Sequence, residues 1–303
     1  MSNIAVVHLV WAPLGIEPFN NFIKSYFKYS AGIKHDLIIL FNGFTSEEET
    51  YEYRMQLSNT KFLFFFMKKK CLDIAAYRTA LNNFDYDFFC FLNSYSVILD
   101  NNWLIKFYSY ASRPEVGLVG ATGGYESIYH TYYGSQSLWK DITTIKKRFI
   151  SCNRSTYGKI LKALSPFGCR LLLYYWYGPF PNYSIRTNAF MAKKTILNKT
   201  CWGKLVSKCD TFRFESGRKS LSKQIVKMGY EILIVGLDGK GYKRDFFYES
   251  NTFRSFNQEN LLISDNRTNE YLMADNHERI ALSVNNWGDK INNHLKIRND
   301  DVS

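Results

Sequence analysis

The chain has 303 residues, of which 46% are hydrophobic and 17% aromatic, and its formal net charge is +12. This composition excludes a disordered chain, and the length is sufficient for one large domain with a sizeable core. The charge favours an anionic partner such as a phosphorylated small molecule, an acidic membrane surface or a nucleic acid. Because the basic residues are scattered and no nucleic-acid-binding motif occurs, we expect no nucleic acid to bind.

The first 120 residues alternate between strand and helix signals. Continuous apolar runs at residues 4–10, 37–41, 62–66, 88–92 and 116–120 predict five buried strands, and segments with helical spacing lie between them. Apolar strands separated by helices are typical of a parallel sheet that helices cover on both faces. The pattern therefore predicts a Rossmann-like α/β fold.

Polar residues mark the starts of the intervening helices. Ser46 with Glu49 predicts a capping box for a helix that runs to about Leu57. Asp73 is expected to open the next helix, and Asp100 to cap the one after it.

The second half of the chain is less regular. The alternation of strand and helix signals is lost between residues 122 and 181. Near its end this segment contains an aromatic block, Leu171–Tyr177. The block could be buried core, a platform for an acceptor or an edge that docks on a membrane. Residues 185–192 and 232–235 predict two further strands, and we expect the polar residues past 276 to pack on the surface or fray.

Cysteine usage and the N-terminus bear on the compartment. The six cysteines form no Cys-x-x-Cys pair and no zinc spacing with histidine, which indicates free thiols in a reducing compartment. Pro13, Glu17 and Pro18 interrupt the first apolar stretch, and no apolar run approaches the ~20 residues that span a bilayer. We expect a cytoplasmic protein, with a peripheral contact at the inner face of the membrane as an open alternative.

The carboxyl ends of the predicted strands locate the chemistry. Ligands of open parallel sheets bind outside these ends. The loops after Val10, Phe41, Phe66 and Leu92 should therefore meet at one edge and hold the functional side chains.

Several of these segments together resemble a known family. Residues 71–78, the strand 88–92, the turn Asn93–Ser96 and the pair Trp103-Leu104 resemble the core of GT-A glycosyltransferases related to family 2. In that family a short helix with Asp and Arg precedes the strand that ends in an Asp-x-Asp motif. The resemblance covers about residues 4–120 and extends more loosely further along the chain. It implies a GT-A fold that binds a nucleotide-diphosphate sugar.

The resemblance also implies a division of the chain. Residues 1–120 would form a nucleotide-sugar-binding half, residues 121–275 an acceptor-binding and catalytic half, and residues 276–303 a polar tail. The implied activity is transfer of a sugar to a glycan or lipid-linked glycan in the synthesis of a bacterial surface polysaccharide such as lipopolysaccharide. A non-catalytic protein that binds nucleotide sugars or glycans is the alternative.

The resemblance places the donor among the strand-end loops. Acidic and amide side chains can bind a base edge or a ribose hydroxyl, and Arg can bind a phosphate through two hydrogen bonds. The alternatives are that Asp73 only caps a helix and that Arg78 is a surface residue. The implied donor-binding residues are Pro13, Leu14, Asn42, Asp73, Arg78, Asn93 and Tyr95.

The turn Asn93–Ser96 departs from the family pattern. The two aspartates of Asp-x-Asp hold a divalent cation with hard oxygen ligands. Because Asn93 and Tyr95 are not anionic, we expect no metal at residues 93–96 and no cofactor. Protein cations would then stabilise the leaving diphosphate. The attraction between two unit charges ~4 Å apart is about 4 kcal/mol at an effective dielectric near 20. The candidates are Arg218, Lys219, Lys243 and Arg244.

Glu215 is the predicted catalytic base. It stands before a predicted helix start, where the resemblance implies the general base of an inverting enzyme. Such a carboxylate takes the proton of the acceptor hydroxyl. Gly217 and Arg218 at that helix start would offer N–H groups to a phosphate. A capping or salt-bridge role for Glu215 is the alternative, and Asp238 and Asp265 are reserve candidates for the base.

The acceptor side is assigned to the predicted strand that starts near residue 185. Arg186 and Asn188 could bind sugar hydroxyls, and the ring of Phe190 could stack on a sugar face. Packing within the strand is the alternative for Phe190.

Overall fold

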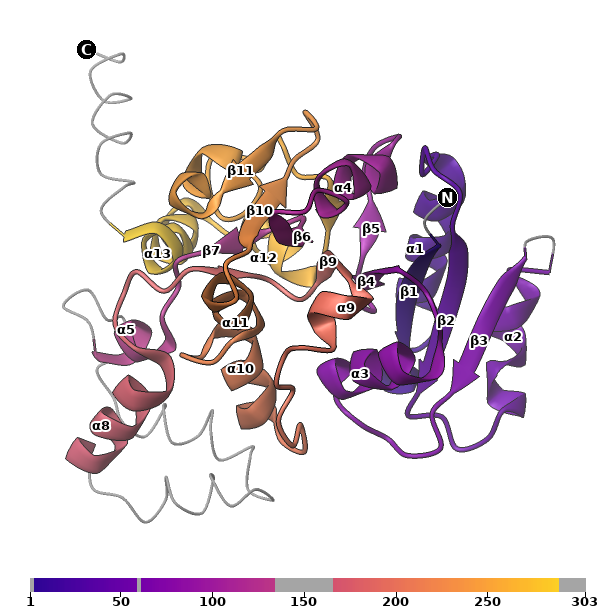
Figure 1. Ribbon diagram of the computed structural model, residues 1–303, viewed down its shortest axis with the longest axis horizontal. Helices are drawn as coiled ribbons and strands as arrows, with labels where there is room; N and C mark the ends of the chain where they lie inside the picture. Colours follow the sequence, from indigo (N-terminus) through magenta and orange to yellow (C-terminus); the bar gives the residue numbers. More distant parts are fainter. Residues whose placement is uncertain (1–2, 59–60, 134–165, 289–303) are drawn as a thin grey trace.

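A large central sheet organises the protein. The computed structural model describes residues 3–58, 61–133 and 166–288. The strands of the central sheet are β1 (Ile4–Trp11), β2 (Asp36–Asn42), β3 (Phe62–Phe66), β4 (Phe88–Leu92), β6 (Val116–Gly120), β9 (Ala189–Lys193), β10 (Glu231–Val235) and β11 (Gly241–Lys243). They are arranged in the order β11-β10-β6-β9-β4-β1-β2-β3 (Figure 1).

The sheet is mostly parallel. Strand β1 pairs in parallel with β2 and β4, β2 with β3, and β6 with β10. Strand β9 runs antiparallel between β4 and β6, and β11 is an antiparallel edge strand. The prediction of a mostly parallel α/β sheet is confirmed. Two small ribbons, β5 (Val97–Ile98) with β12 (Ile263–Ser264) and β7 (Gly123–Gly124) with β8 (Ser184–Ile185), lie beside it.

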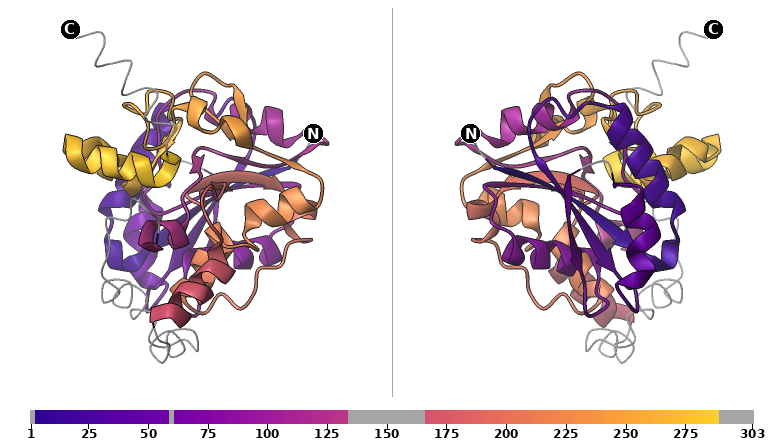
Figure 2. Two further views of the ribbon diagram at one scale, coloured as in Figure 1. Left: turned by 90° about the vertical axis from the view of Figure 1, so that its left-hand side faces the viewer. Right: turned by 90° about the vertical axis from the view of Figure 1, so that its right-hand side faces the viewer.

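Helices cover both faces of the sheet (Figure 2). Apolar side chains of α3 (Asp73–Asn83), α9 (Lys194–Leu197), α10 (Lys208–Ser216) and α11 (Leu221–Lys227) pack on one face. The other face is covered by α1 (Glu17–Lys28), α2 (Tyr51–Met55) and α4 (Trp103–Ala111). The remaining helical elements are η1 (Ala12–Leu14), η2 (Glu48–Thr50), α5 (Ile128–Tyr133), α8 (Pro166–Tyr177), η3 (Arg244–Phe246), η4 (Tyr248–Ser250), α12 (Asn266–Met273) and α13 (Asn276–Trp287).

Two predicted helix caps are wrong. Asp100 does not cap α4, because Asn102 occupies the cap in a left-handed conformation and Asp100 forms an ion pair with Lys106. The partner of Glu49 is Thr45 instead of Ser46, with the Thr45 backbone N–H donating to the carboxylate at 3.0 Å. The Asn102 side chain forms no capping hydrogen bond either, so α4 begins without a side-chain cap.

The aromatic block lies in helix α8, which has apolar side chains on its buried side and on its exposed side. Cys169, Leu173 and Tyr177 are buried and form a small core with Cys209 of α10. Tyr175, on the other side of α8, is 71% exposed. The block is therefore partly core and partly surface. Within the described ranges, no helix is both long and apolar enough to cross a membrane.

Helix α13 packs firmly on the rest of the protein. Trp287 is 1% exposed, and its indole N–H donates to the backbone oxygen of Phe253 at 2.9 Å. The ring also packs against Tyr125 and Tyr248. The predicted polar tail thus begins with a helix that contributes to the core, and its residues 289–303 lie outside the described ranges.

Candidate active site

The antiparallel strand β9 builds the site. Because β9 runs against β4, the residues before β9 meet the residues that follow β4. Leu92 pairs with Ala189, and the backbone N–H of Asn93 donates to the Asn188 oxygen at 2.8 Å. The predicted acceptor-side residues and the altered Asp-x-Asp turn therefore lie side by side at the carboxyl edge of the parallel strands.

A pocket of about 310 Å³ opens at this edge, and we call it the sheet-edge pocket. It brings together five residues that the sequence predicts for the site, although they come from four separate segments. These residues are Asp73, Asn93, Arg186, Asn188 and Glu215.

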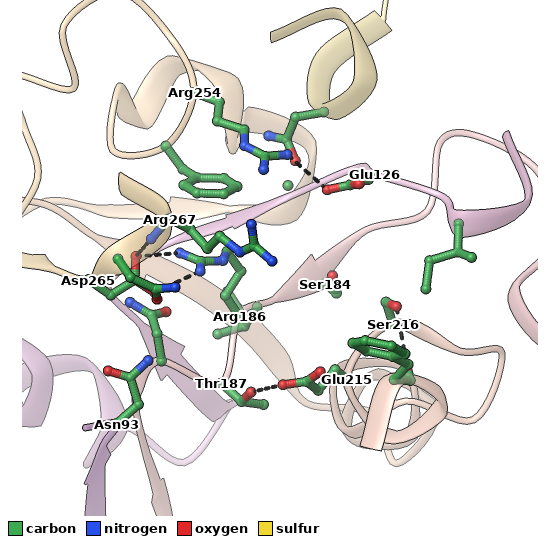
Figure 3. A pocket seen from close by; sticks show the side chains of 18 of the residues that line it. Asn93, Glu126, Ser184, Arg186, Thr187, Glu215, Ser216, Arg254, Asp265 and Arg267 are labelled. Carbon is green, nitrogen blue, oxygen red and sulfur yellow. Dashed lines mark hydrogen bonds and ion pairs between the residues drawn. The ribbon is translucent and has the colours of Figure 1, made fainter. Parts of the chain in front are cut away.

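Glu215 is half-buried in the last turn of α10, beside Thr187 (Figure 3). Thr187 Oγ1 donates a hydrogen bond to Glu215 Oε1. Burial and the nearby charge of Asp73 raise the pKa of Glu215 to about 8, while the Thr187 hydrogen bond and the Arg186 charge act in the opposite direction. The carboxyl group can thus exchange its proton near neutral pH.

The expected position of Glu215 before a helix start is wrong. Gly217 terminates α10, and α11 begins only at Leu221, where the Ser220 side chain accepts from the Lys223 backbone N–H. Ser220 is a better cap than Gly217 because its hydroxyl can accept this bond. Gly217 and Arg218 therefore do not form the predicted phosphate-binding helix start.

Three arginines lie opposite Glu215 in the sheet-edge pocket, namely Arg186, Arg254 and Arg267 (Figure 3). Arg186 Nη2 is 2.7 Å from Asp265 Oδ2, and Asp265 is 1% exposed. Asp265 also caps α12 by accepting from two backbone N–H groups. Its bonds to Arg186 hold the pKa of Asp265 below its usual value despite its burial. Asp265 is thus a structural partner of Arg186, and its prediction as a reserve base stays untested.

Arg254 extends this basic side of the pocket. Its Nη1 is 3.1 Å from Glu126 Oε2, and only 9% of its side chain is exposed. Within the described part of the chain, the buried Arg254 Nε and the amide nitrogens of Asn188 and Asn286 have no hydrogen-bond partner. Buried donors are rarely left unpaired. The three guanidinium groups of the pocket lining are suited to a ligand with acceptor oxygens.

The turn 93–96 does not supply metal ligands. Asn93 Oδ1 already accepts from the Tyr95 backbone N–H and from Ser96 Oγ, each at 3.0 Å. The Tyr95 side chain is 37% exposed and does not line the pocket. In the part of the chain that the structure describes, no three His, Cys, Asp or Glu side chains gather at a common point. The residues of this turn therefore do not fit a divalent cation.

Several residues predicted to contact the donor lie outside the sheet-edge pocket. Pro13 and Leu14 form η1 after β1. Asn42 is fully buried, and its side chain both donates to and accepts from the backbone of Cys71, at 2.9 and 3.1 Å. This pair of bonds positions the loop that leads to α3. Arg78 Nη1 donates to the Gly203 oxygen at 3.0 Å, away from the pocket.

The predicted phosphate-binding cations also lie elsewhere. Arg218 Nε donates to the Tyr174 backbone oxygen at 3.2 Å. Lys243, on the edge strand β11, forms an ion pair of 2.6 Å with Glu231 of β10. Lys219 and Arg244 do not line the pocket either. Phe190 is 1% exposed and packs against Tyr77 and Phe91, so its ring belongs to the core.

Sequence reasoning missed four residues that complete the pocket. They are Glu126, Thr187, Arg254 and Arg267. Thr187 adjoins Arg186 and could have been found as the neighbour of a predicted site residue. Glu126 and Arg254 lie in stretches without helical or strand periodicity, where no motif marks them, whereas Arg267 lies in the first turn of α12, two residues after its cap Asp265.

Comparison with known proteins gives matches in structure alone. No protein-family model matches the chain, and no curated protein matches it in sequence. A mannosyltransferase, PcManGT from Pyrobaculum calidifontis, in complex with GDP-Man and Mn²⁺, is 14% identical with a TM-score of 0.33, over 39% of this chain and 35% of that one. GalNAc-T7 with UDP, GalNAc and Mn²⁺ is 12% identical with a TM-score of 0.33, over 40% and 23%. TarS of S. aureus, residues 1–349 with UDP-GlcNAc, is 12% identical with a TM-score of 0.30, over 39% and 33%.

These matches correct one prediction. The expectation that no divalent metal takes part is contradicted, because two of the three similar structures are complexes with Mn²⁺. The absence of aspartates at residues 93–96 was too local a basis for excluding a metal from the whole site. The chain spans about a third or less of the length of each of these proteins. These three structures are of glycosyltransferases, the class that the sequence of this chain resembles.

Proposed function

We propose that this protein is an inverting glycosyltransferase that moves a sugar from a nucleotide-diphosphate donor to a glycan acceptor, with Glu215 as the general base. The observation that supports it most is the placement of Glu215 in the sheet-edge pocket. There the carboxyl group, whose pKa is raised to about 8, lies opposite three arginines. Strongly shifted carboxyl groups in clefts are frequent at catalytic sites.

The proposed chemistry assigns the two sides of the pocket to different steps. On one side, Glu215 takes the proton of the acceptor hydroxyl as its oxygen attacks the anomeric carbon. The bond between this carbon and the donor phosphate oxygen breaks in line, so the configuration inverts. On the other side, the guanidinium groups of Arg254 and Arg267 stabilise the charge that develops on the leaving diphosphate.

The pKa of Glu215 suits this role. A base that is too acidic accepts a proton poorly, and one that is too basic is already protonated at working pH. A value of about 8 lies close to neutrality, so a useful fraction of Glu215 is ionised and still strongly basic. Thr187 holds the carboxylate in place through its hydrogen bond.

We propose that the same pocket holds the donor and the acceptor. In this proposal Asp73 and Asn93 offer oxygen and nitrogen atoms to donor hydroxyls, and Arg186 and Asn188 bind the acceptor; all four line the pocket. We propose a bacterial surface polysaccharide, which could be lipid-linked, as the acceptor, and action at the cytoplasmic side of the membrane.

Donor turnover tests the proposal. The purified protein is incubated with a panel of nucleotide sugars in the presence of Mn²⁺, and release of the nucleotide diphosphate is followed. Glu215→Gln should lower turnover by about 10²- to 10⁴-fold, because a positioned base contributes on that scale. The exposed Glu278 lies outside the pocket, so Glu278→Gln is the matched control and should retain full turnover.

The rival function predicts a different result. A non-catalytic binding protein would bind a nucleotide sugar in calorimetry but release no diphosphate with any acceptor. Equal turnover in wild type and Glu215→Gln would instead show that another group is the base.

A further inference from the structure

Helix α10 has a second functional face. Phe212, Glu215 and Ser216 line the sheet-edge pocket. Asp210, Arg213 and Phe214 line a separate cleft. Each set has the spacing i, i+3, i+4 of one helix face, and the two sets are offset by two residues, which places them on opposite sides. The two cavities are thus separated by about one helix diameter, ~10 Å.

The second cavity, which we call the cationic cleft, has a volume of about 930 Å³. It is formed by α8, α10, α11 and the segment from Lys199 to Lys204 (Figure 1). Seven basic residues and one acidic residue, Asp210, line it. The basic residues are Lys199, Lys204, Arg213, Arg218, Lys219, Lys223 and Lys227.

The acidic residue does not neutralise the cleft. Asp210 Oδ2 accepts from the backbone N–H and the hydroxyl of Ser207, at 3.0 and 2.7 Å, and so completes the capping box of α10. Across the described ranges, no ion pair involves Lys199, Lys204, Arg218, Lys219, Lys223 or Lys227. Burial and the charge of Arg218 lower the pKa of Lys223, which is the effect expected of cations without a counter-ion.

Aromatic rings accompany the cations. Tyr175 of α8 is 71% exposed at the cleft. Trp176 and Trp202 form part of the wall but are only 7% and 6% exposed, and Trp202 stacks on Phe214 with ring centroids 4.8 Å apart, so Tyr175 offers the accessible ring. Amphipathic rings provide flat contact surfaces at low cost in conformational entropy, and Lys and Arg bind phosphate and carboxylate groups. The cleft therefore matches a chain that carries both sugar rings and negative charges.

We propose that the cationic cleft binds an anionic glycan, a sugar chain that bears phosphate or carboxylate groups, at a distance from the reacting end. The proposal rests on the glycosyltransferase function above and specifies its acceptor as a polyanionic chain. A concave cleft of this volume favours a flexible chain over a flat bilayer. The binding sites on the two faces of α10 would then hold two parts of one acceptor.

Binding to charged dextrans tests this inference without any donor. Size-matched neutral dextran, carboxymethyl dextran and phosphorylated dextran are titrated against the full chain, and binding is followed by calorimetry and tryptophan fluorescence. We expect both anionic dextrans to bind and the neutral one not to bind. The variant Lys199→Gln/Lys204→Gln/Lys227→Gln should weaken binding about tenfold, since each exposed charge pair contributes modestly. All three lysines are exposed and lie in the cleft.

A matched control separates the cleft from net charge. Lys24, Lys28 and Lys34 are exposed and lie outside the cleft, so the Lys→Gln variant at these three positions should bind like wild type. Equal losses in both variants would overturn the proposal. So would preferential binding to phosphatidylglycerol vesicles or to a single-stranded oligonucleotide that displaces the dextrans. Donor turnover by the wild type is measured separately. A protein that binds the anionic dextrans but turns over no donor would contradict the proposed transferase activity, whereas one that turns over a donor but binds no dextran would contradict the proposed role of the cationic cleft.

Discussion

The two cavities on either side of helix α10 use charge in opposite ways. In the sheet-edge pocket, Arg186 and Arg254 are paired with Asp265 and Glu126, and one member of each pair, Asp265 or Arg254, is buried. In the cationic cleft, four of the five lysines are exposed, and none of the five takes part in an ion pair within the described ranges. Paired and buried charges have fixed positions, which suits transition-state stabilisation. Unpaired charges at a wide cleft create a field that attracts an anionic chain from a distance.

This difference in charge pairing indicates how substitutions in each cavity affect the stability of the fold. Fixed ion pairs are costly to break, because the remaining partner stays buried without compensation. Unpaired surface cations repel one another and contribute little to folding. Stability and function should therefore be coupled in the sheet-edge pocket and separable in the cationic cleft.

The largest effect on stability is expected at Asp265. Asp265→Asn keeps an oxygen for capping α12 but removes the charge that pairs with Arg186. We expect the free energy of unfolding to fall by about 3 kcal/mol, the low end for a broken buried pair. Lys227→Gln in the cationic cleft should change it by less than about 0.5 kcal/mol. Urea denaturation of both variants measures the two changes in the free energy of unfolding. Similar decreases for Asp265→Asn and Lys227→Gln would contradict the proposed difference between the two cavities.

A smaller effect concerns the dependence of stability on pH. The folded state binds a proton at Glu215 more tightly than the unfolded chain, because the pKa rises from 4.5 to about 8 on folding. Stability should thus decline as the pH rises from about 4.5 to about 8 and then level off. Glu215→Gln cannot ionise, so its melting temperature should exceed that of wild type at about pH 9 and approach it at about pH 5. A constant difference in thermal unfolding across this range would contradict the assignment.

The smallest effects are shifts of the pH–activity profile. Asp73→Asn removes a charge that raises the pKa of Glu215, so activity should appear at lower pH. Thr187→Val removes a hydrogen bond that lowers this pKa, so activity should require higher pH. Thr187→Ser retains the hydroxyl and serves as the control. The midpoint of kcat/KM against pH is measured for each variant, and shifts in the same direction for Asp73→Asn and Thr187→Val would exclude Glu215 as the titrating base.

Much of the parallel half of the fold could be predicted from local patterns. Apolar runs such as Ile4–Val10 and Phe88–Leu92 can be buried only as strands in a sheet covered on both faces, and helical periodicity between them implies crossover helices. The resemblance of residues 71–78 and 93–96 to the GT-A core then singled out Asp73 and Asn93. Helix caps were less predictable, as Asp100 shows, because a side chain that could cap a helix can instead form an ion pair, here with Lys106.

Tertiary structure alone decided which side chains meet. The antiparallel register of β9 brought Arg186 and Asn188 to Asn93, while helix α10 placed Glu215 beside Thr187. Arg254 reached the same pocket from a stretch without periodicity. The structure also changed the interpretation of the turn Asn93–Ser96. Asn93 and Ser96 form hydrogen bonds within the turn, and these bonds give no information about a metal elsewhere in the site. Local sequence determines which segments form strands and helices, but register and packing determine which of their ends share a site, because those contacts join residues far apart in the chain.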